Sequence, residues 1–198
     1  MSGVRPRGSQ ASVARTPQST IIFGNAGNTS WDVEYELRDI HAFVRETRLY
    51  FDRDASLAAL QREEGDGLHC ALDIHTSHAR RGASYIVFSG GRGYRTAAYV
   101  RFGELFAVAP FATVLVSNLS ARSPDASLPL IFQINGTESV IMNNIAATRK
   151  AKKMFNAAFY SFLTSGNGPA VAYRNAVLQM IKDPEYRAPG LWGPFFLW

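Results

Sequence analysis

The residues best suited to chemistry gather in one stretch, residues 67–77, which reads GLHCALDIHTS. It holds His69 and His75, two of the four histidines, and Cys70, the single cysteine. A thiol becomes a nucleophile when a histidine within hydrogen-bond distance takes its proton. The same stretch offers a second arrangement, in which Asp73 orients His75 as the base for a serine nucleophile. The sequence therefore suggests two hypotheses for the end of this apolar strand, cysteine catalysis and serine catalysis.

Serines for the second arrangement follow another apolar segment, at Ser117 and Ser120. A serine hydroxyl is a poor nucleophile unless an oriented base lies within hydrogen-bond distance. Because the spacing to His75 is loose, structural roles are the simpler interpretation for both serines. His75 and His78 are in turn expected to be exposed loop residues.

The strand itself also has a structural interpretation. Cys70 is expected to point into the core, where a free cysteine usually behaves as an inert, small apolar residue. His69 is expected to be a partly buried strand histidine with a hydrogen-bonded ring.

Strands alternate with helices along the chain, which predicts an α/β fold. Strands are predicted at 20–23, 49–51, 68–74, 112–117 and 139–142, and a β-hairpin at 85–88 and 96–100. Helices are predicted at 32–46, around residues 57–60, at 151–163 and at 169–181, and residues 191–198 are expected to be an edge strand or a strap. This order predicts a three-layer α/β/α sandwich with a mostly parallel central sheet and a β-hairpin. Sites in such folds lie beyond the carboxyl ends of central strands, here after 68–74 and after 112–117.

Composition narrows the function classes. The chain has 198 residues, of which 46% are hydrophobic and 19% charged, an ordinary balance for one globular domain. No apolar run approaches the roughly 18 residues of a membrane span, so no membrane partner is expected. A single cysteine allows no internal disulfide, which favours a reducing compartment inside the cell, most simply the cytoplasm.

Two basic regions account for much of the net charge of +5. Residues 1–19 are predicted to be a flexible basic tail before a folded domain at 20–198, and their Arg-rich, Ser-rich character leaves organellar targeting open. The second region, residues 149–153, is expected to be a solvated helix face. Neither is interleaved with stacking aromatic residues, so no nucleic-acid partner is expected. The glycine clusters at 24–28 and 90–93 lack the spacing of phosphate-binding loops, and neither a cofactor nor a metal site is predicted.

Several segments together carry a family resemblance. They are the lead-in at 34–44, 49–51 and 54–60, then Asp66-Gly67-Leu68-His69, the strand at 84–90, Val114-Leu115-Val116-Ser117, the helix end at 159–166, the helix segment at 172–176 and Pro189-Gly190-Leu191-Trp192-Gly193-Pro194-Phe195. In order and spacing they resemble the CHAT domain, a caspase-like cysteine peptidase family, over most of residues 20–198. The resemblance implies a caspase-like fold with a catalytic histidine at one strand end and a cysteine at the end of the neighbouring strand.

The histidine position departs from the family pattern. The family reads Leu-His-x-Ala-x-His-Gly, in which the last histidine is catalytic. Aligning Leu68, His69 and Ala71 directly places Asp73 on that histidine. A shift of two residues would place His75 there instead.

The nucleophile position departs as well. The family's Leu-Ser-Ala-Cys corresponds to residues 116–119, so Leu119 stands where the cysteine belongs. The resemblance then implies a peptidase-like domain that no longer cleaves and that binds a protein partner or a peptide segment, alone or docked on a separate subunit. The alternative is an active hydrolase built from His75, Asp73 and Ser117 or Ser120. A third hypothesis sets the resemblance aside and predicts a doubly wound domain that binds a small ligand.

Overall fold

A six-stranded sheet forms the centre of the computed structural model, which describes residues 19–24, 31–44, 46–64, 66–72, 74–76, 84–89, 97–118, 127–143 and 147–198. Its strands are β1 (Ser19–Gly24), β2 (Glu46–Phe51), β3 (Gly67–Leu72), β7 (Thr113–Asn118), β8 (Ser139–Asn143) and β9 (Phe195–Leu197), in the spatial order β2-β1-β3-β7-β8-β9. All neighbouring pairs are parallel except β8 with β9. The mostly parallel central sheet is therefore confirmed.

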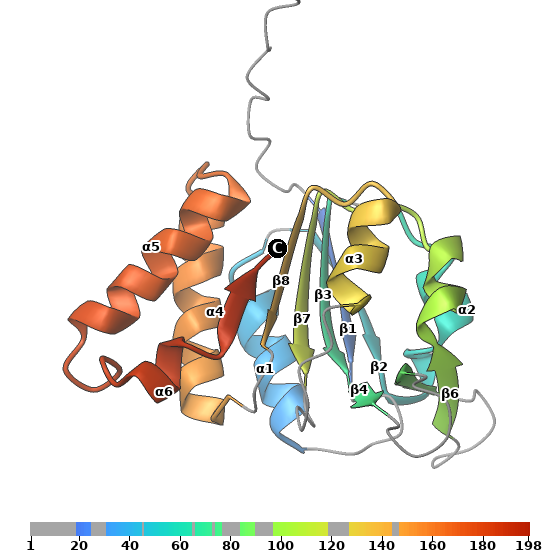
Figure 1. Cartoon of the computed structure of the whole chain (residues 1–198), viewed down its shortest axis with the longest axis horizontal. Coiled ribbons are helices and arrows are strands. Elements are labelled where there is room, and N and C mark those ends of the chain that lie inside the picture. Colours follow the sequence, from blue (N-terminus) through green and yellow to red (C-terminus); the bar gives the residue numbers. More distant parts are fainter. Residues whose placement is uncertain are drawn as a thin grey trace, which may run out of the picture.

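Helices cover both faces of this sheet (Figure 1). On one face lie α1 (Trp31–His41) and α4 (Arg149–Thr164), with α5 (Pro169–Lys182) and α6 (Pro189–Trp192) outside α4. The other face carries α2 (Leu57–Leu60) and α3 (Ser127–Ile134), together with the 3-10 turns η1 (Asp52–Asp54) and η2 (Phe102–Ala107). The predicted three-layer α/β/α sandwich is confirmed.

A second, antiparallel sheet interrupts the predicted strand at 68–74. Its order is β4 (Ile74–Thr76), β5 (Ser84–Ser89) and β6 (Ala97–Arg101), and the β5–β6 pair is the predicted hairpin. The prediction of a single strand at 68–74 was wrong, because β3 ends at Leu72 and Ile74 already pairs with Ile86 of β5. β1 ends at Gly24, opposite Ala71, and β7 ends at Asn118, opposite Leu72, so the described pairing of β3 with its neighbours stops at Leu72.

Alternate residues of the strands fill two separate cores, as the two-residue period of a sheet requires. On β3, Leu68 and Cys70 face the α2, α3 and η2 side, whereas Ala71 faces α1, α4 and α5. In the second core Phe155 stacks on Phe195 with ring centroids 4.1 Å apart. Burial of one such ring contributes about 1.5–3 kcal/mol, which helps to hold α4 against the edge strand β9.

Other boundaries also differ from the predictions. The helix predicted at 32–46 ends at His41, where Phe43 N–H donates to Ile40 O in a tighter turn and the chain enters β2 at Glu46. Helix α3 was not predicted, because a short apolar run around Pro129 resembles a strand as much as a helix. Of the closing segment at 191–198, Phe195–Leu197 forms the expected edge strand and pairs with β8, whereas Leu191 and Trp192 belong to α6.

Within the described ranges, no helix is both long enough and apolar enough to cross a membrane. The predicted tail at 1–19 lies outside these ranges except for Ser19, which opens β1.

Candidate functional site

The carboxyl ends of β3 and β7 lie side by side. Leu72 and Asn118 are register partners in parallel strands, and they directly precede Asp73 and Leu119 in the chain. Asp73, Leu119 and Ser120 lie outside the described residues. The strand ends that precede the predicted catalytic positions are thus adjacent.

His75 belongs to the second sheet. Its backbone lies in β4, opposite Tyr85 of β5. The expectation that His75 is a loop residue was therefore wrong, because the chain after β3 forms a new antiparallel ladder. His78 lies outside the described residues.

Cys70 is buried, as expected. Only 1% of its surface is exposed, and it is part of the core between the sheet and α2, α3 and η2. Burial raises the pKa of its thiol, which keeps the sulfur protonated and a poor nucleophile.

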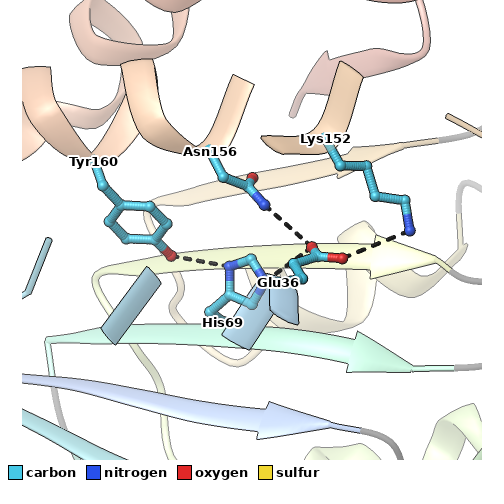
Figure 2. Close-up of polar contacts among 5 residues, drawn as sticks. All are labelled: Glu36, His69, Lys152, Asn156 and Tyr160. Carbon is cyan, nitrogen blue, oxygen red and sulfur yellow. Dashed lines mark hydrogen bonds and ion pairs between the residues drawn. The ribbon is translucent and has the colours of Figure 1, made fainter. Parts of the chain in front are cut away.

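A group of buried polar side chains lies directly behind these strand ends, on the α1 and α4 side. It consists of Glu36, His69, Ser117, Lys152, Asn156 and Tyr160, here termed the Glu36 cluster, and Figure 2 shows all of them except Ser117. His69 is completely buried, rather than partly buried as predicted, and its Nδ1 lies 3.0 Å from the Tyr160 hydroxyl. Its Nε2 lies 3.4 Å from Glu36 Oε1.

Helix α4 supplies half of the cluster. Lys152, Asn156 and Tyr160 recur every fourth residue, so they form one stripe along the helix. Asn156 Nδ2 donates to Glu36 Oε1 at 3.1 Å, and Lys152 Nζ lies 3.7 Å from Glu36 Oε2 (Figure 2). The expected solvated face at 149–153 is found for Arg149, Lys150 and Lys153, which are exposed, but not for Lys152, whose side chain is only 13% exposed.

The remaining basic residues of that region find partners nearer the surface. Lys153 forms an ion pair with Asp39 at 3.5 Å, and the Arg149 guanidinium lies 4.6 Å from the centre of the Tyr35 ring. Such contacts contribute little each, but they join α4 to α1 at the rim of the buried cluster.

Glu36 is the charged centre of the cluster. Burial by itself would raise its pKa, but the contact with His69 and the charge of Lys152 outweigh burial and lower the pKa to about 2. Burial also raises the pKa of Tyr160, so the phenol stays neutral. At neutral pH the cluster therefore contains an ionised carboxylate opposite an ammonium group.

Ser117 completes the cluster from β7. It is 3% exposed and pairs in register with Ala71, on the face of the sheet that Glu36 covers. Its hydroxyl lies close enough to lower the pKa of Glu36, although among the described residues it makes no hydrogen bond of good geometry. The Glu36 cluster is almost entirely buried, with the Glu36 side chain 9% exposed and the Lys152 side chain 13% exposed.

The sequence contained a signal for this cluster that the apolar pattern hid. The apolar stripe of α4 is evident, but the parallel stripe at 152, 156 and 160 points to a polar patch beneath the helix. The polar groups that meet this stripe are the carboxylate of Glu36, which is next to the buried Leu37 in α1, and the imidazole of His69 in the otherwise apolar strand β3. No spacing rule joins these residues, because they come from distant parts of the chain.

The architecture defines a class of protein. A mostly parallel sheet covered by helices on both faces, with a small antiparallel sheet after β3, is a three-layer α/β/α sandwich. The CHAT domain family model matches residues 4–198, and the chain belongs to that family. A comparison with curated proteins found no match. Among the described residues, no group of three or more His, Cys, Asp or Glu side chains could hold a metal ion.

Proposed function

We propose that this CHAT domain has lost cysteine peptidase activity and serves as a protein-interaction or regulatory domain. The observation that carries the proposal is the position of the only cysteine. Cys70 lies inside β3 and is buried, whereas the family's nucleophile follows the strand that is β7 here. Leu119 occupies that place, and an alkyl side chain cannot attack a carbonyl carbon.

The intact fold around the candidate site supports a domain that still binds a partner. The adjacent ends of β3 and β7 and the second sheet are all formed. A peptide or protein segment that the family would cleave is therefore the class of partner we propose, with recognition retained and the chemical step absent.

Peptide cleavage is the direct test. The purified protein is incubated with fluorogenic peptides that carry a basic residue before the scissile bond, which the family resemblance suggests. We expect no turnover above a protein-free blank. Turnover that is lost on thiol alkylation or on Cys70→Ala would overturn the proposal.

A gain-of-function variant sharpens the test. Installing the family's residues with Asp73→His and Leu119→Cys together supplies a base and a nucleophile at the two strand ends. If the binding frame is retained, the double variant cleaves peptides that the unchanged protein only binds. Each single variant is the matched control, because a thiol without its base reacts far more slowly.

The alternative is a hydrolase that uses His75 and Asp73 with Ser117 or Ser120. The burial of the Ser117 hydroxyl against Glu36 counts against Ser117, because a substrate carbonyl needs to approach the nucleophile within about 3 Å. Activity that survives thiol alkylation but disappears in His75→Ala would favour this alternative with Ser120 as its nucleophile.

A further inference from the structure

His69 is held between two polar groups with no access to solvent. Its Nδ1 lies 3.0 Å from the Tyr160 hydroxyl and its Nε2 lies 3.4 Å from Glu36 Oε1 (Figure 2). In a neutral imidazole one ring nitrogen donates and the other accepts, and the neighbouring groups select which. The tautomer of His69 is therefore selected by these two neighbours.

The two neighbours have opposite requirements. An ionised carboxylate such as Glu36 can only accept, so the nitrogen that faces it must carry the hydrogen. The neutral Tyr160 phenol has a hydrogen to donate, and Nδ1 is the acceptor within reach. A single tautomer suits both contacts: the Nδ1 contact is a hydrogen bond, whereas the 3.4 Å approach of Nε2 to Glu36 Oε1 is an electrostatic contact without good hydrogen-bond geometry.

The charge balance favours the neutral ring over the imidazolium. Lys152 already lies 3.7 Å from the second oxygen of Glu36 and compensates its charge. A second cation in this buried layer would be uncompensated, which is strongly unfavourable in a low-dielectric interior.

The Glu36 carboxylate also lies close to both strands whose ends form the candidate site. His69 lies in β3 and Ser117 in β7, and the Glu36 carboxylate lies close to both. Asn156 and Lys152 hold Glu36 from the opposite side, on α4. One carboxylate thus links α1, α4 and both strands immediately behind the site positions.

We propose that Glu36 and Tyr160 clamp His69 as the neutral ring with its hydrogen on Nε2, and that through this clamp Glu36 is a positioning residue for the carboxyl ends of β3 and β7. The proposal holds whether or not the domain cleaves peptides, and its failure would leave the proposed function untouched.

Nitrogen NMR of the histidine rings tests the first half. The His69 ring is assigned through its neighbour Tyr160, whose ring centroid lies 5.9 Å away. At neutral pH we expect Nε2 to give the signal of a protonated nitrogen and Nδ1 that of a bare, hydrogen-bonded nitrogen. A hydrogen on Nδ1, or on both nitrogens, would overturn the proposal.

Variants separate the clamp from general packing. Tyr160→Phe should move the Nδ1 signal and leave Nε2 protonated, whereas Glu36→Gln should move the Nε2 signal. Glu34→Gln is the matched control on the same helix, since Glu34 pairs with Arg38 at the surface, and it should move neither. Unchanged His69 signals in Glu36→Gln would contradict the clamp. If Glu36→Gln fails to fold, Tyr160→Phe decides the matter alone.

Amide hydrogen exchange tests the positioning role. Glu36→Gln should speed exchange of residues 69–72 and 115–118 about tenfold and leave β8 unaffected, because the loss is local to the two strand ends. Lys152→Met, which keeps the carboxylate but removes its countercharge, should act in the same direction. Equal acceleration in every strand, or none at the strand ends, would show that Glu36 does not position them.

Discussion

Two regions a few residues apart on the same strands differ sharply in character. The carboxyl ends of β3 and β7 are followed in the chain by Asp73 and Leu119, which the sequence resemblance predicts at the positions of the family's histidine and cysteine. Directly behind them, the Glu36 cluster joins six polar side chains from two helices and two strands. Residues at a strand end can be replaced without disturbing the core, whereas removal of Glu36, Lys152 or Tyr160 leaves another buried polar group without its partner. The comparison teaches that the frame and the chemistry of this domain are constrained separately.

Removal of Lys152 should have the largest effect. Lys152→Met leaves the buried Glu36 carboxylate without its countercharge, and breaking a buried pair from one side costs about 3–5 kcal/mol. Urea denaturation should show this loss in the free energy of unfolding. Lys153→Met is the control, because its ion pair with Asp39 is exposed and should cost less than about 1 kcal/mol. Equal losses would mean that the cluster is no more important than the surface.

Acid should weaken the protein through the same carboxylate. The pKa of Glu36 falls from 4.5 to about 2 on folding, so its contribution is fully present above pH 4.5 and is lost as the pH falls toward 2. The shift corresponds to about 3 kcal/mol as an order of magnitude. Unfolding free energies from pH 6 to pH 2 should decline more steeply in the unchanged protein than in Glu36→Gln. Parallel curves would contradict the assignment.

Loss of the Tyr160 hydroxyl should be milder. Tyr160→Phe keeps the ring in its core position but leaves Nδ1 of the buried His69 without its partner, at a cost of about 1–3 kcal/mol. Thermal unfolding measures the difference. Tyr173→Phe is a useful comparison, because its hydroxyl donates to Phe195 O at a half-buried site and should matter less.

Ser117→Ala should have the smallest effect. The hydroxyl makes no hydrogen bond of good geometry among the described residues, so the expected change is within about 1 kcal/mol. A large loss of stability would show that Ser117 belongs to the supporting cluster as firmly as His69 does.

The sequence predicted the layers but not the junction between the two sheets. Continuous apolar runs such as 112–117 identify buried parallel strands, because both faces of such strands are covered. The division of 68–74 into β3 and β4 could not be predicted, since the apolar Ile74 continues the apolar pattern of the strand whichever sheet it joins. Helix α3 escaped prediction for a related reason, because eight mostly apolar residues fit either period.

The candidate site was only partly accessible to sequence reasoning. The buried thiol of Cys70 could be predicted from the apolar strand around it. The partners of His69 could not, since Glu36 and Tyr160 lie 33 and 91 residues away and meet only when α1 and α4 pack on one face of the sheet.

The single buried cysteine is also a natural probe of how often the central sheet opens. Because Cys70 lies in the strand between β1 and β7, a thiol reagent reaches it only when those strands separate or the helices on that face lift away. Its labelling rate therefore measures how often the centre of the domain opens. With no second thiol in the chain, that measurement needs no engineered probe.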